Sequence, residues 1–253
     1  MYGETGLDLG LYKPEQMRRR ILSLGKAVKA ESLDEFWTYL LASPERIQAF
    51  TDRLAINVSE FYRDPTKWQE LVGIIQNLRE DSPSLKCWSA GCSFGAEAYT
   101  LGILLDVHFP AQHTILGTDI DRAALGQARR GEFSEAEMSG LPQEIRKFYF
   151  TQNRSRFNWK VKETLAENVR FEGHNLLEDE FDVGYDLILC RNVAIYLQES
   201  AKVELYKKFY TALRPGGFLF TGSTERIYDF MEYGFDSSMP FFYRKPVKRL
   251  ATV

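Results

Sequence analysis

The stretch of the chain whose residue types best suit chemistry is a loop of small residues between an apolar segment and an apolar helix. Cys87 to Leu105 reads CWSAGCSFGAEAYTLGILL, and its loop carries glycines at positions 91 and 95. Glycine adopts backbone angles that other residues avoid, so main-chain N–H groups and a helix N-terminus can face a ligand there. Such a loop also serves simply to pack a strand against a helix, so the loop alone leaves both interpretations open.

An acidic residue at the end of the next apolar segment favours the ligand interpretation. Asp119 follows the sequence TILGT, and Asp121 opens a predicted helix. A carboxylate at the carboxyl end of a parallel strand can hold ribose hydroxyls, as in nucleotide sites at the switch point of an open sheet. The loop before it lacks the third glycine of the dinucleotide motif. An aspartate here could instead cap the helix, and we expect Asp121 to be that cap.

Three more polar residues follow apolar segments that read as strands. Asn175 lies in GHNLL, and Arg191 and Asn192 lie in CRNVAIYL. Buried amides need hydrogen-bond partners, and the edge of an adenine ring could supply them. Asparagine also stabilises turns by bonding its own backbone, so loop structure explains these positions equally well from their spacing alone.

The first third of the chain reads as helices only. From Lys13 to about Asn77 apolar residues recur every three or four positions, and no strand pattern interrupts them, which predicts a small helical bundle. Helix starts are indicated at Pro14, at Ser32 with a glutamate three positions later, and at Pro44. The segment 64–78 reads as a longer connecting helix.

After residues 81–84 the pattern changes to short apolar strands that alternate with helices. This alternation predicts a parallel sheet with crossover helices, which would bring the strand ends and their polar residues to one edge. The predicted helices between strands include 97–107 and 122–130. The predicted strands are 85–90, 113–118, 169–173, 185–190, 217–221 and 241–244.

Composition excludes several classes of protein. A net charge of −3 disfavours nucleic-acid binding, which usually needs a basic domain. No apolar run reaches the roughly 18 residues that span a bilayer, and the N-terminus lacks signal-peptide features, so we expect no membrane insertion and a cytoplasmic location. The three cysteines, at positions 87, 92 and 190, have neither disulfide nor zinc-ligand spacing, so we expect no metal.

Taken together, the motifs resemble those of the CheR-type chemotaxis receptor glutamate methyltransferases in content and order. They are NVSEFYRD, CWSAGCSFGAEAYTL, LGTDID, VRFEGHNLL, FDVGYDLILCRNVAIYL and LRPGGFLFTGSTE, and they cover nearly the whole chain. The resemblance implies an α/β fold, a class I S-adenosylmethionine-dependent methyltransferase with a Rossmann-like sheet, preceded by a small all-helical domain. We therefore assign residues 1–78 to the helical domain and connecting helix and 84–253 to the methyltransferase domain, and a small inserted β-subdomain is suggested over 151–163.

The same resemblance implies roles for individual residues. S-adenosyl-L-methionine would be the cofactor and S-adenosyl-L-homocysteine the product, with Arg63 and Tyr196 at the reaction centre. Glu97 would lie near the methionine portion and Asp119 on the ribose. Without the resemblance, Arg63 would read as an exposed helix-end arginine and Tyr196 as a buried aromatic. The expected cofactor contacts are Asn57, Ser59, Arg63, Ala90, Glu97, Asp119, Asn175, Leu176, Arg191 and Asn192.

Some positions depart from the usual family pattern. The loop commonly reads GEEPY in relatives and reads GAEAY here, so Ala96 and Ala98 replace an acid and a proline while Glu97 is retained. Ser59 stands where threonine is common and keeps the hydroxyl, and Ala194 replaces a larger apolar residue. None of these changes indicates loss of activity.

The first helix is basic, with Arg18, Arg19 and Arg20 in succession. The resemblance implies that it docks on the cytoplasmic helical region of a chemoreceptor, whose glutamates would attract it. Three consecutive arginines spread around a helix, so a solvated face is the other interpretation. We expect a monomer. The segment 153–163, a predicted hairpin, lacks the glycine used by relatives that bind a receptor tail, so we expect no tail binding.

Two other functions stay open from the sequence alone. One is a methyltransferase of the same fold acting on a different substrate. The other is a non-catalytic, cofactor-binding signalling module.

Overall fold

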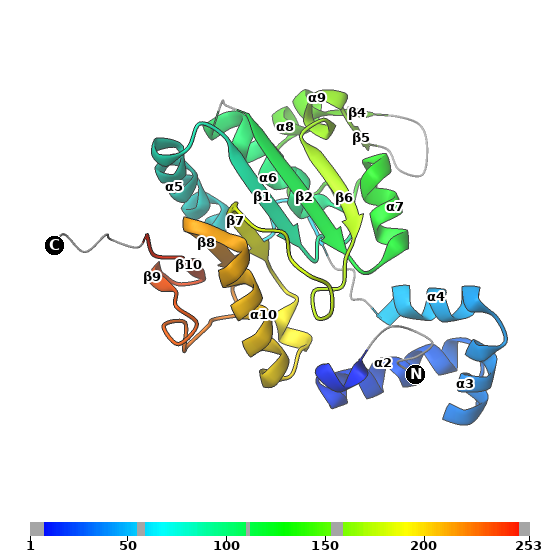
Figure 1. Ribbon diagram of the computed structural model, residues 1–253. Helices are drawn as coiled ribbons and strands as arrows, with labels where there is room; N and C mark the ends of the chain where they lie inside the picture. The colour runs from blue at the N-terminus through cyan, green and yellow to red at the C-terminus, as the bar shows by residue number, and fades with distance from the viewer. Residues whose placement is uncertain (1–7, 55–58, 110–111, 153–158, 248–253) are drawn as a thin grey trace.

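The computed structural model describes residues 8–54, 59–109, 112–152 and 159–247, in which a group of helices lies beside a sheet with helices on both faces (Figure 1). A 3₁₀ turn, η1 (Leu9–Leu11), precedes α2 (Pro14–Ala27), α3 (Leu33–Leu41) and α4 (Pro44–Leu54). Ser32 caps α3 by accepting a hydrogen bond from the Glu35 N–H at 3.1 Å. The helix starts predicted at Pro14, Ser32 and Pro44 are therefore confirmed.

The helical group has a small core of its own. Phe36, Leu40, Phe50 and Leu54 are buried, and apolar side chains of α2 pack against them: Met17, Ile21 and Leu24. None of the helices in the described ranges combines the length and apolar character needed to cross a membrane.

The main sheet, counted over the described residues, has seven strands in the order β6-β2-β1-β7-β8-β10-β9. Pairing is parallel from β6 to β8 and antiparallel at β10 and β9. Because the chain leaves β1 for β2 on one side and reaches β7 on the other, the strand order reverses at β1, and ligands bind at the carboxyl ends beside such a point. The strands are β1 (Leu85–Ala90), β2 (His113–Asp119), β6 (Val169–Gly173), β7 (Tyr185–Cys190), β8 (Leu213–Thr221), β9 (Asp236–Met239) and β10 (Phe242–Arg244).

Alternate residues of the central strands enter two separate cores, as the period of a strand requires. Cys87 and Leu187 belong to the core that contains α6 (Ala96–His108) and α7 (Arg122–Arg130), whereas Trp88 and Ile188 face α10 (Glu199–Ala212). The connecting helix α5 (Pro65–Asp81) lies against α6 and buries its apolar side chains in the same core as the sheet. Residues 96 and 98–105 of α6 are consequently buried on every side.

A second, smaller sheet in the described residues pairs β3 (Glu132–Phe133), β5 (Trp159–Val161) and β4 (Phe150–Gln152). Helices α8 (Gln143–Tyr149) and α9 (Glu163–Ala166) flank it. The hairpin strands lie at 150–152 and 159–161, and the third strand, β3, was not predicted. Residues 153–158 lie outside the described ranges, so the expectation about tail binding stays a prediction.

The segment before α2 is joined to the carboxyl edge of the main sheet. The Lys13 N–H donates to the Tyr196 carbonyl at 2.8 Å, and the Gln198 N–H donates to the Leu11 carbonyl at 2.9 Å. The Gln198 side chain also donates to the carbonyls of Gly10 and Tyr12, at 2.6 and 3.2 Å. These bonds place the helical group directly over the strand ends.

Candidate active site

An open cleft with an empty volume of about 1220 Å³ lies at the carboxyl edge of the main sheet, where the helical group covers it. Residues that the sequence singled out line it together: Arg20, Ser59, Arg63, Glu97, Asp119, Asn175, Leu176, Arg191, Asn192 and Tyr196. Ala90 is fully buried and is not part of the lining. Arg18 and Arg19 are exposed outside the cleft, and Asn57 lies outside the described residues.

Asp119 ends β2 with its carboxylate fixed by two backbone donors. The Ser93 N–H donates to Oδ2 at 2.8 Å and the Asp121 N–H donates to Oδ1 at 2.9 Å. Burial raises the pKa of Asp119, and these hydrogen bonds oppose the rise. Asp121 accepts from the Ala124 N–H at 2.9 Å and caps α7, as predicted. Asp119 keeps lone pairs that can accept hydrogen bonds from hydroxyl groups in the cleft.

The glycine loop after β1 lets two strand-end loops meet beside the cleft. Gly91 has a φ of +82°, and a Cβ there would lie 2.5 Å from Cγ2 of Val193. Any other residue would therefore be strained at this φ and would force the Val193 side chain to move. Gly95, with a φ of +91°, precedes α6, and a Cβ there would lie 2.9 Å from Cβ of Ala128 and 3.0 Å from Cζ of Phe171.

Glu97 lies in the first turn of α6, almost fully enclosed. Its Oε1 accepts from the Ser89 hydroxyl at 2.8 Å, and its Oε2 lies 3.4 Å from Nη1 of Arg191. Burial raises the pKa of Glu97 and outweighs the opposing effects of Arg191 and Ser89. A carboxylate in this position can bind an ammonium group.

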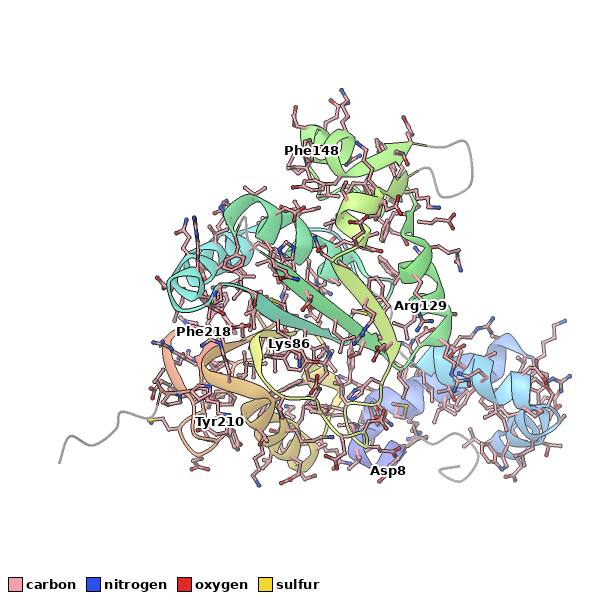
Figure 2. All side chains as sticks on the ribbon, turned by 45° about the horizontal axis from the view of Figure 1, so that its top comes forward. Asp8, Lys86, Arg129, Phe148, Tyr210 and Phe218 are labelled. Atoms are coloured by element: carbon pink, nitrogen blue, oxygen red, sulfur yellow. The ribbon has the colours of Figure 1, made fainter. Side chains whose placement is uncertain are left out.

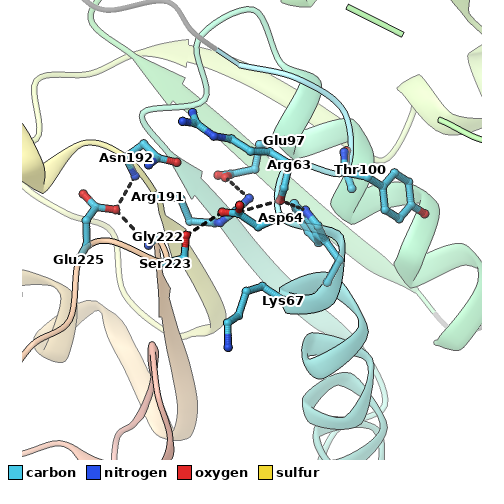
Figure 3. A network of polar contacts seen from close by, with 12 residues as sticks. Arg63, Asp64, Lys67, Glu97, Thr100, Arg191, Asn192, Gly222, Ser223 and Glu225 are labelled. Carbon is cyan, nitrogen blue, oxygen red and sulfur yellow. Dashed lines mark hydrogen bonds and ion pairs between the residues drawn. The ribbon is translucent and has the colours of Figure 1, made fainter. Parts of the chain in front are cut away.

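Arg191 is the centre of the polar network drawn in Figure 3, and its side chain is only 2% exposed. Nη2 donates to the Arg63 carbonyl at 2.8 Å and pairs with Asp64 at 3.1 Å. The guanidinium lies 5.2 Å from the Trp68 ring centroid and 4.9 Å from that of Phe220. Arg191 therefore holds other cleft residues in place in addition to lining the cleft.

The segment that carries Arg63 is anchored on both sides of that residue. Phe61 packs edge-on against the rings of both Phe133 and Phe150, with centroid distances of 4.8 and 5.4 Å. Asp64 has a φ of +59° and accepts from the Ser223 hydroxyl at 2.9 Å (Figure 3). The backbone of Arg63 is thus fixed while its side chain lines the cleft.

The turn after β7 is held by Glu225, a residue to which the sequence assigned no role. Its carboxylate accepts from the N–H groups of Asn192 and of Gly222, the latter at 3.0 Å (Figure 3), and from that of Ile195 at 3.2 Å. Glu225 is 5% exposed, and burial raises its pKa. Since Asn192 and Tyr196 belong to this turn, Glu225 positions both.

The loop after β6 is stabilised in a different way. Oδ1 of Asn175 accepts from the Leu177 N–H at 3.1 Å, so Asn175 does stabilise a turn, one of the two roles that the sequence left open. Its amide nitrogen has no partner among the described residues. Lys208 of α10 donates to the carbonyls of Leu176, at 3.1 Å, and Asp179, at 2.7 Å. The amide of Asn175 can therefore meet a base edge from a fixed turn.

The helical group contributes the remaining wall of the cleft. Tyr12 lines it, and burial together with the nearby carboxylates of Glu178 and Asp119 raises its pKa to about 12. Arg20 lines the cleft from α2 and donates through Nε to the Arg53 carbonyl at 2.9 Å. Burial lowers the pKa of Arg20, and the nearby Tyr196 opposes this.

The polar groups of this cleft fit S-adenosylmethionine. A carboxylate for hydroxyls, a second carboxylate for an ammonium group and an amide for a base edge come from Asp119, Glu97 and Asn175 respectively. Their arrangement along one cleft at the switch point of the sheet suits an extended nucleoside with an amino-acid tail.

Comparison with known proteins identifies the family. The family model "CheR methyltransferase, SAM binding domain" matches residues 57–238, and "CheR methyltransferase, all-alpha domain" matches residues 1–55.

Individual relatives agree over nearly the whole chain. The chemotaxis protein methyltransferase of Listeria monocytogenes is 37% identical, over 96% of this chain and 93% of that protein. Its counterpart in Listeria innocua is 38% identical over the same shares. The one from Borreliella burgdorferi is 30% identical, over 90% of this chain and 85% of its own length. The chain therefore belongs to the CheR methyltransferase family, as an S-adenosylmethionine-dependent methyltransferase of chemotaxis whose SAM-binding domain, built on a mostly parallel sheet, follows an all-helical domain.

Proposed function

We propose that this methyltransferase forms methyl esters on glutamate side chains of chemoreceptor proteins. The observation that carries the proposal is that Arg63, Tyr196 and the carboxylates of Glu97 and Asp119 line one cleft although they come from four separate segments of the chain. The names of the relatives, which are chemotaxis protein methyltransferases, support a receptor as the substrate.

The reaction depends more on the alignment of the reacting atoms than on proton transfer. A glutamate with an ordinary pKa of about 4.3 is already ionised at neutral pH, so its oxygen needs no general base. When bound, the cofactor supplies an electrophilic methyl group on a sulfonium sulfur. Holding the acceptor oxygen, the methyl carbon and the sulfur in line supplies about 7–11 kcal/mol in well-oriented cases.

Four residues of the site would hold the cofactor in this scheme. Asp119 would bind the ribose hydroxyls, Glu97 the ammonium group, and Asn175 with Leu176 the adenine. Each has a fixed backbone or side-chain position, since Ser93, Ser89 and Leu177 provide the hydrogen bonds described above. Little reorganisation is then needed on binding.

Arg63 and Tyr196 would act on the acceptor. The planar guanidinium of Arg63 can hold a carboxylate at two points, and the Tyr196 hydroxyl can donate one hydrogen bond. We assign both a positioning role, because full neutralisation of the attacking oxygen would reduce its nucleophilicity.

The basic residues of α2 would guide the receptor towards the cleft. Arg20 reaches the cleft itself, whereas Arg18 and Arg19 are exposed next to it. We propose that the two exposed arginines attract the acidic receptor helices and raise the association rate.

Incubation with methyl-labelled cofactor and receptor-containing membranes tests the proposed function. Methyl esters release labelled methanol in mild base, whereas N-methyl groups do not, so base-labile counts identify the product. We expect such counts with the wild-type chain, and a fall of about 100-fold for Arg63→Ala, equivalent to about 2.7 kcal/mol in the barrier. Arg79→Ala, an exposed arginine on α5, is the control. Tight cofactor binding without any base-labile product would contradict the proposal.

A further inference from the structure

A second groove lies on the far side of the turn that carries Tyr196. It has an empty volume of about 1120 Å³ and lies between the start of α10 and the segment 223–233 that follows β8. Ala194 and Ile195 form part of its wall, and the next residue, Tyr196, lines the first cleft. One short turn therefore separates the two hollows.

The first cleft is closed to a large partner along much of its rim. The loops after β1, β2 and β6 carry the residues that would bind the cofactor, and the helical group covers another side. The part of the sheet edge that follows β7 and β8 remains, and the second groove opens there. A protein that inserts a glutamate beside Tyr196 can lie along this part of the edge.

A large apolar side chain in contact with water lines the groove, and a second one lies just outside it. Tyr228, which lines the groove, is 78% exposed, and Met231, three residues further along the same segment, is 74% exposed, the highest values for large hydrophobic side chains in the described part of the chain. Grouped exposed apolar side chains of this size are typical of surfaces that bind another protein. Both belong to the segment that follows β8.

Basic groups lie next to these apolar side chains. The Arg226 guanidinium is 5.6 Å from the Tyr228 ring centroid, and Lys202 lines the groove from α10. Glu199 pairs with Lys202 at 2.7 Å, and Glu225 accepts the backbone N–H groups of the neighbouring turn. Of the other charged groups that line the groove, Lys13 and Arg226 are positive and Asp229 is negative, which leaves a small positive excess. This combination suits a helix with an apolar face and acidic flanks.

We propose that this groove, bounded by Ile195, Lys202 and the segment 226–231, binds the acceptor helix next to the glutamate that is methylated. The proposal rests on the proposed function. One helical turn advances 5.4 Å, so residues three and four positions from the glutamate would lie beyond the Ala194–Tyr196 turn and reach the groove. Tyr228 and Met231 contact the apolar face of the helix, and Arg226 contacts its acidic flank.

Tyr228→Ala and Arg226→Glu test the groove, with Phe148→Ala as the matched control. Phe148 is 71% exposed and lies on α8, beside the small sheet. Figure 2 shows Phe148 near the top of the molecule and Tyr210, which belongs to α10, in its lower part. Because Tyr228 and Arg226 are exposed, we expect all three variants to keep the wild-type unfolding temperature. Calorimetry with S-adenosylhomocysteine should give unchanged affinity for each.

Two measurements then test whether the groove binds the acceptor helix. We expect the KM for receptor membranes to rise about tenfold in Tyr228→Ala and Arg226→Glu and to stay unchanged in Phe148→Ala. Co-sedimentation with the same membranes, which needs no methyl transfer, should fall in parallel. Unchanged co-sedimentation and KM in both groove variants would overturn the proposal. Absence of base-labile methyl groups from the wild-type reaction would instead contradict the proposed function, while co-sedimentation would still decide the groove.

Discussion

The two ends of the cleft are fixed by different kinds of interaction. At one end, here called the transfer end, Arg63 and Tyr196 are positioned by buried charges, namely Arg191 and Glu225. At the other, the nucleoside end, Asp119 and the loop that carries Asn175 are held by backbone N–H groups and by the half-buried Lys208.

The difference follows from what each end must do. In-line transfer loses rate steeply when reacting atoms are misplaced by about 1 Å, so the transfer end gains from a rigid, desolvated network. Nucleoside binding tolerates larger shifts of single side chains because its free energy is distributed over several contacts. We therefore expect substitutions at the transfer end to act on stability and kcat, and those at the nucleoside end to act on cofactor affinity.

The largest effect is expected from Arg191→Met. This change leaves the buried Glu97 and the Asp64 carboxylate without their shared cation. Removing one partner of a buried ion pair costs about 3–5 kcal/mol, so we expect the free energy of unfolding in urea to fall by about 3 kcal/mol. Lys207→Met, which breaks the exposed pair with Glu204, is the control and should have little effect. Equal stability of the two variants would show that the transfer end does not depend on buried charge.

Glu225→Gln should have the next largest effect, and on the rate of transfer. One carboxylate accepts three backbone N–H groups, whereas a carboxamide has a single oxygen and an N–H₂ group that would face other donors. The turn with Asn192 and Tyr196 would loosen, and we expect kcat to fall about 100-fold, or about 2.7 kcal/mol. Affinity for S-adenosylhomocysteine should change far less. A loss of affinity as large as the loss of kcat would contradict a specific role at the transfer end.

Asp119→Asn tests the nucleoside end. We expect affinity for S-adenosylhomocysteine to fall about tenfold, the usual cost of one weakened charged hydrogen bond, with kcat at saturating cofactor nearly unchanged. Asparagine also imitates the protonated carboxyl. Because burial raises the pKa of Asp119 above the ordinary aspartate pKa of about 3.8, the wild-type carboxyl takes up its proton at a higher pH than an exposed aspartate does.

The pH dependence of affinity follows with a definite sign. In the proposed function the ribose hydroxyls would donate to the ionised carboxylate, so wild-type affinity should decrease as pH falls through that raised pKa, while the affinity of the Asp119→Asn variant should vary less. Calorimetry between pH 4.5 and 8 measures both. A wild-type affinity with the same pH profile as the variant would mean that Asp119 does not carry the binding.

Local patterns in the sequence were sufficient to predict the features that depend on neighbouring residues. The Asp121 cap and the strands 85–90, 169–173 and 185–190 were predicted at the observed positions. Strand β8 begins four residues earlier than predicted, because the structure continues the strand through Pro215 and Gly216, residues that are uncommon within strands, and pairs Leu213 with Tyr185. Strand β9 was missed because DSSM has no apolar alternation.

The supports of the site escaped prediction because their partners are distant in sequence. Glu225 holds an N–H 33 residues away, and Arg191 pairs with Asp64 across 127 residues. No spacing rule links such positions, since the fold alone brings them together. The available signal was indirect: a glutamate in the motif GSTE, directly after a strand whose last residues are buried.

Lys208→Met should produce the smallest effect and sharpen the comparison most. The change keeps an unbranched apolar stem but removes the two hydrogen bonds to the carbonyls of Leu176 and Asp179. The loop would lose only partly exposed bonds, worth about 0.5–1.5 kcal/mol each at most, so we expect about a threefold loss of affinity for S-adenosylhomocysteine. Lys207→Met, one position away on α10, should leave affinity unchanged. Because the transfer end does not contact Lys208, kcat should stay within a factor of about two in both variants, a difference below 0.5 kcal/mol. A fall in kcat of Lys208→Met comparable to that of Glu225→Gln would mean that the two ends are mechanically coupled and not independently supported.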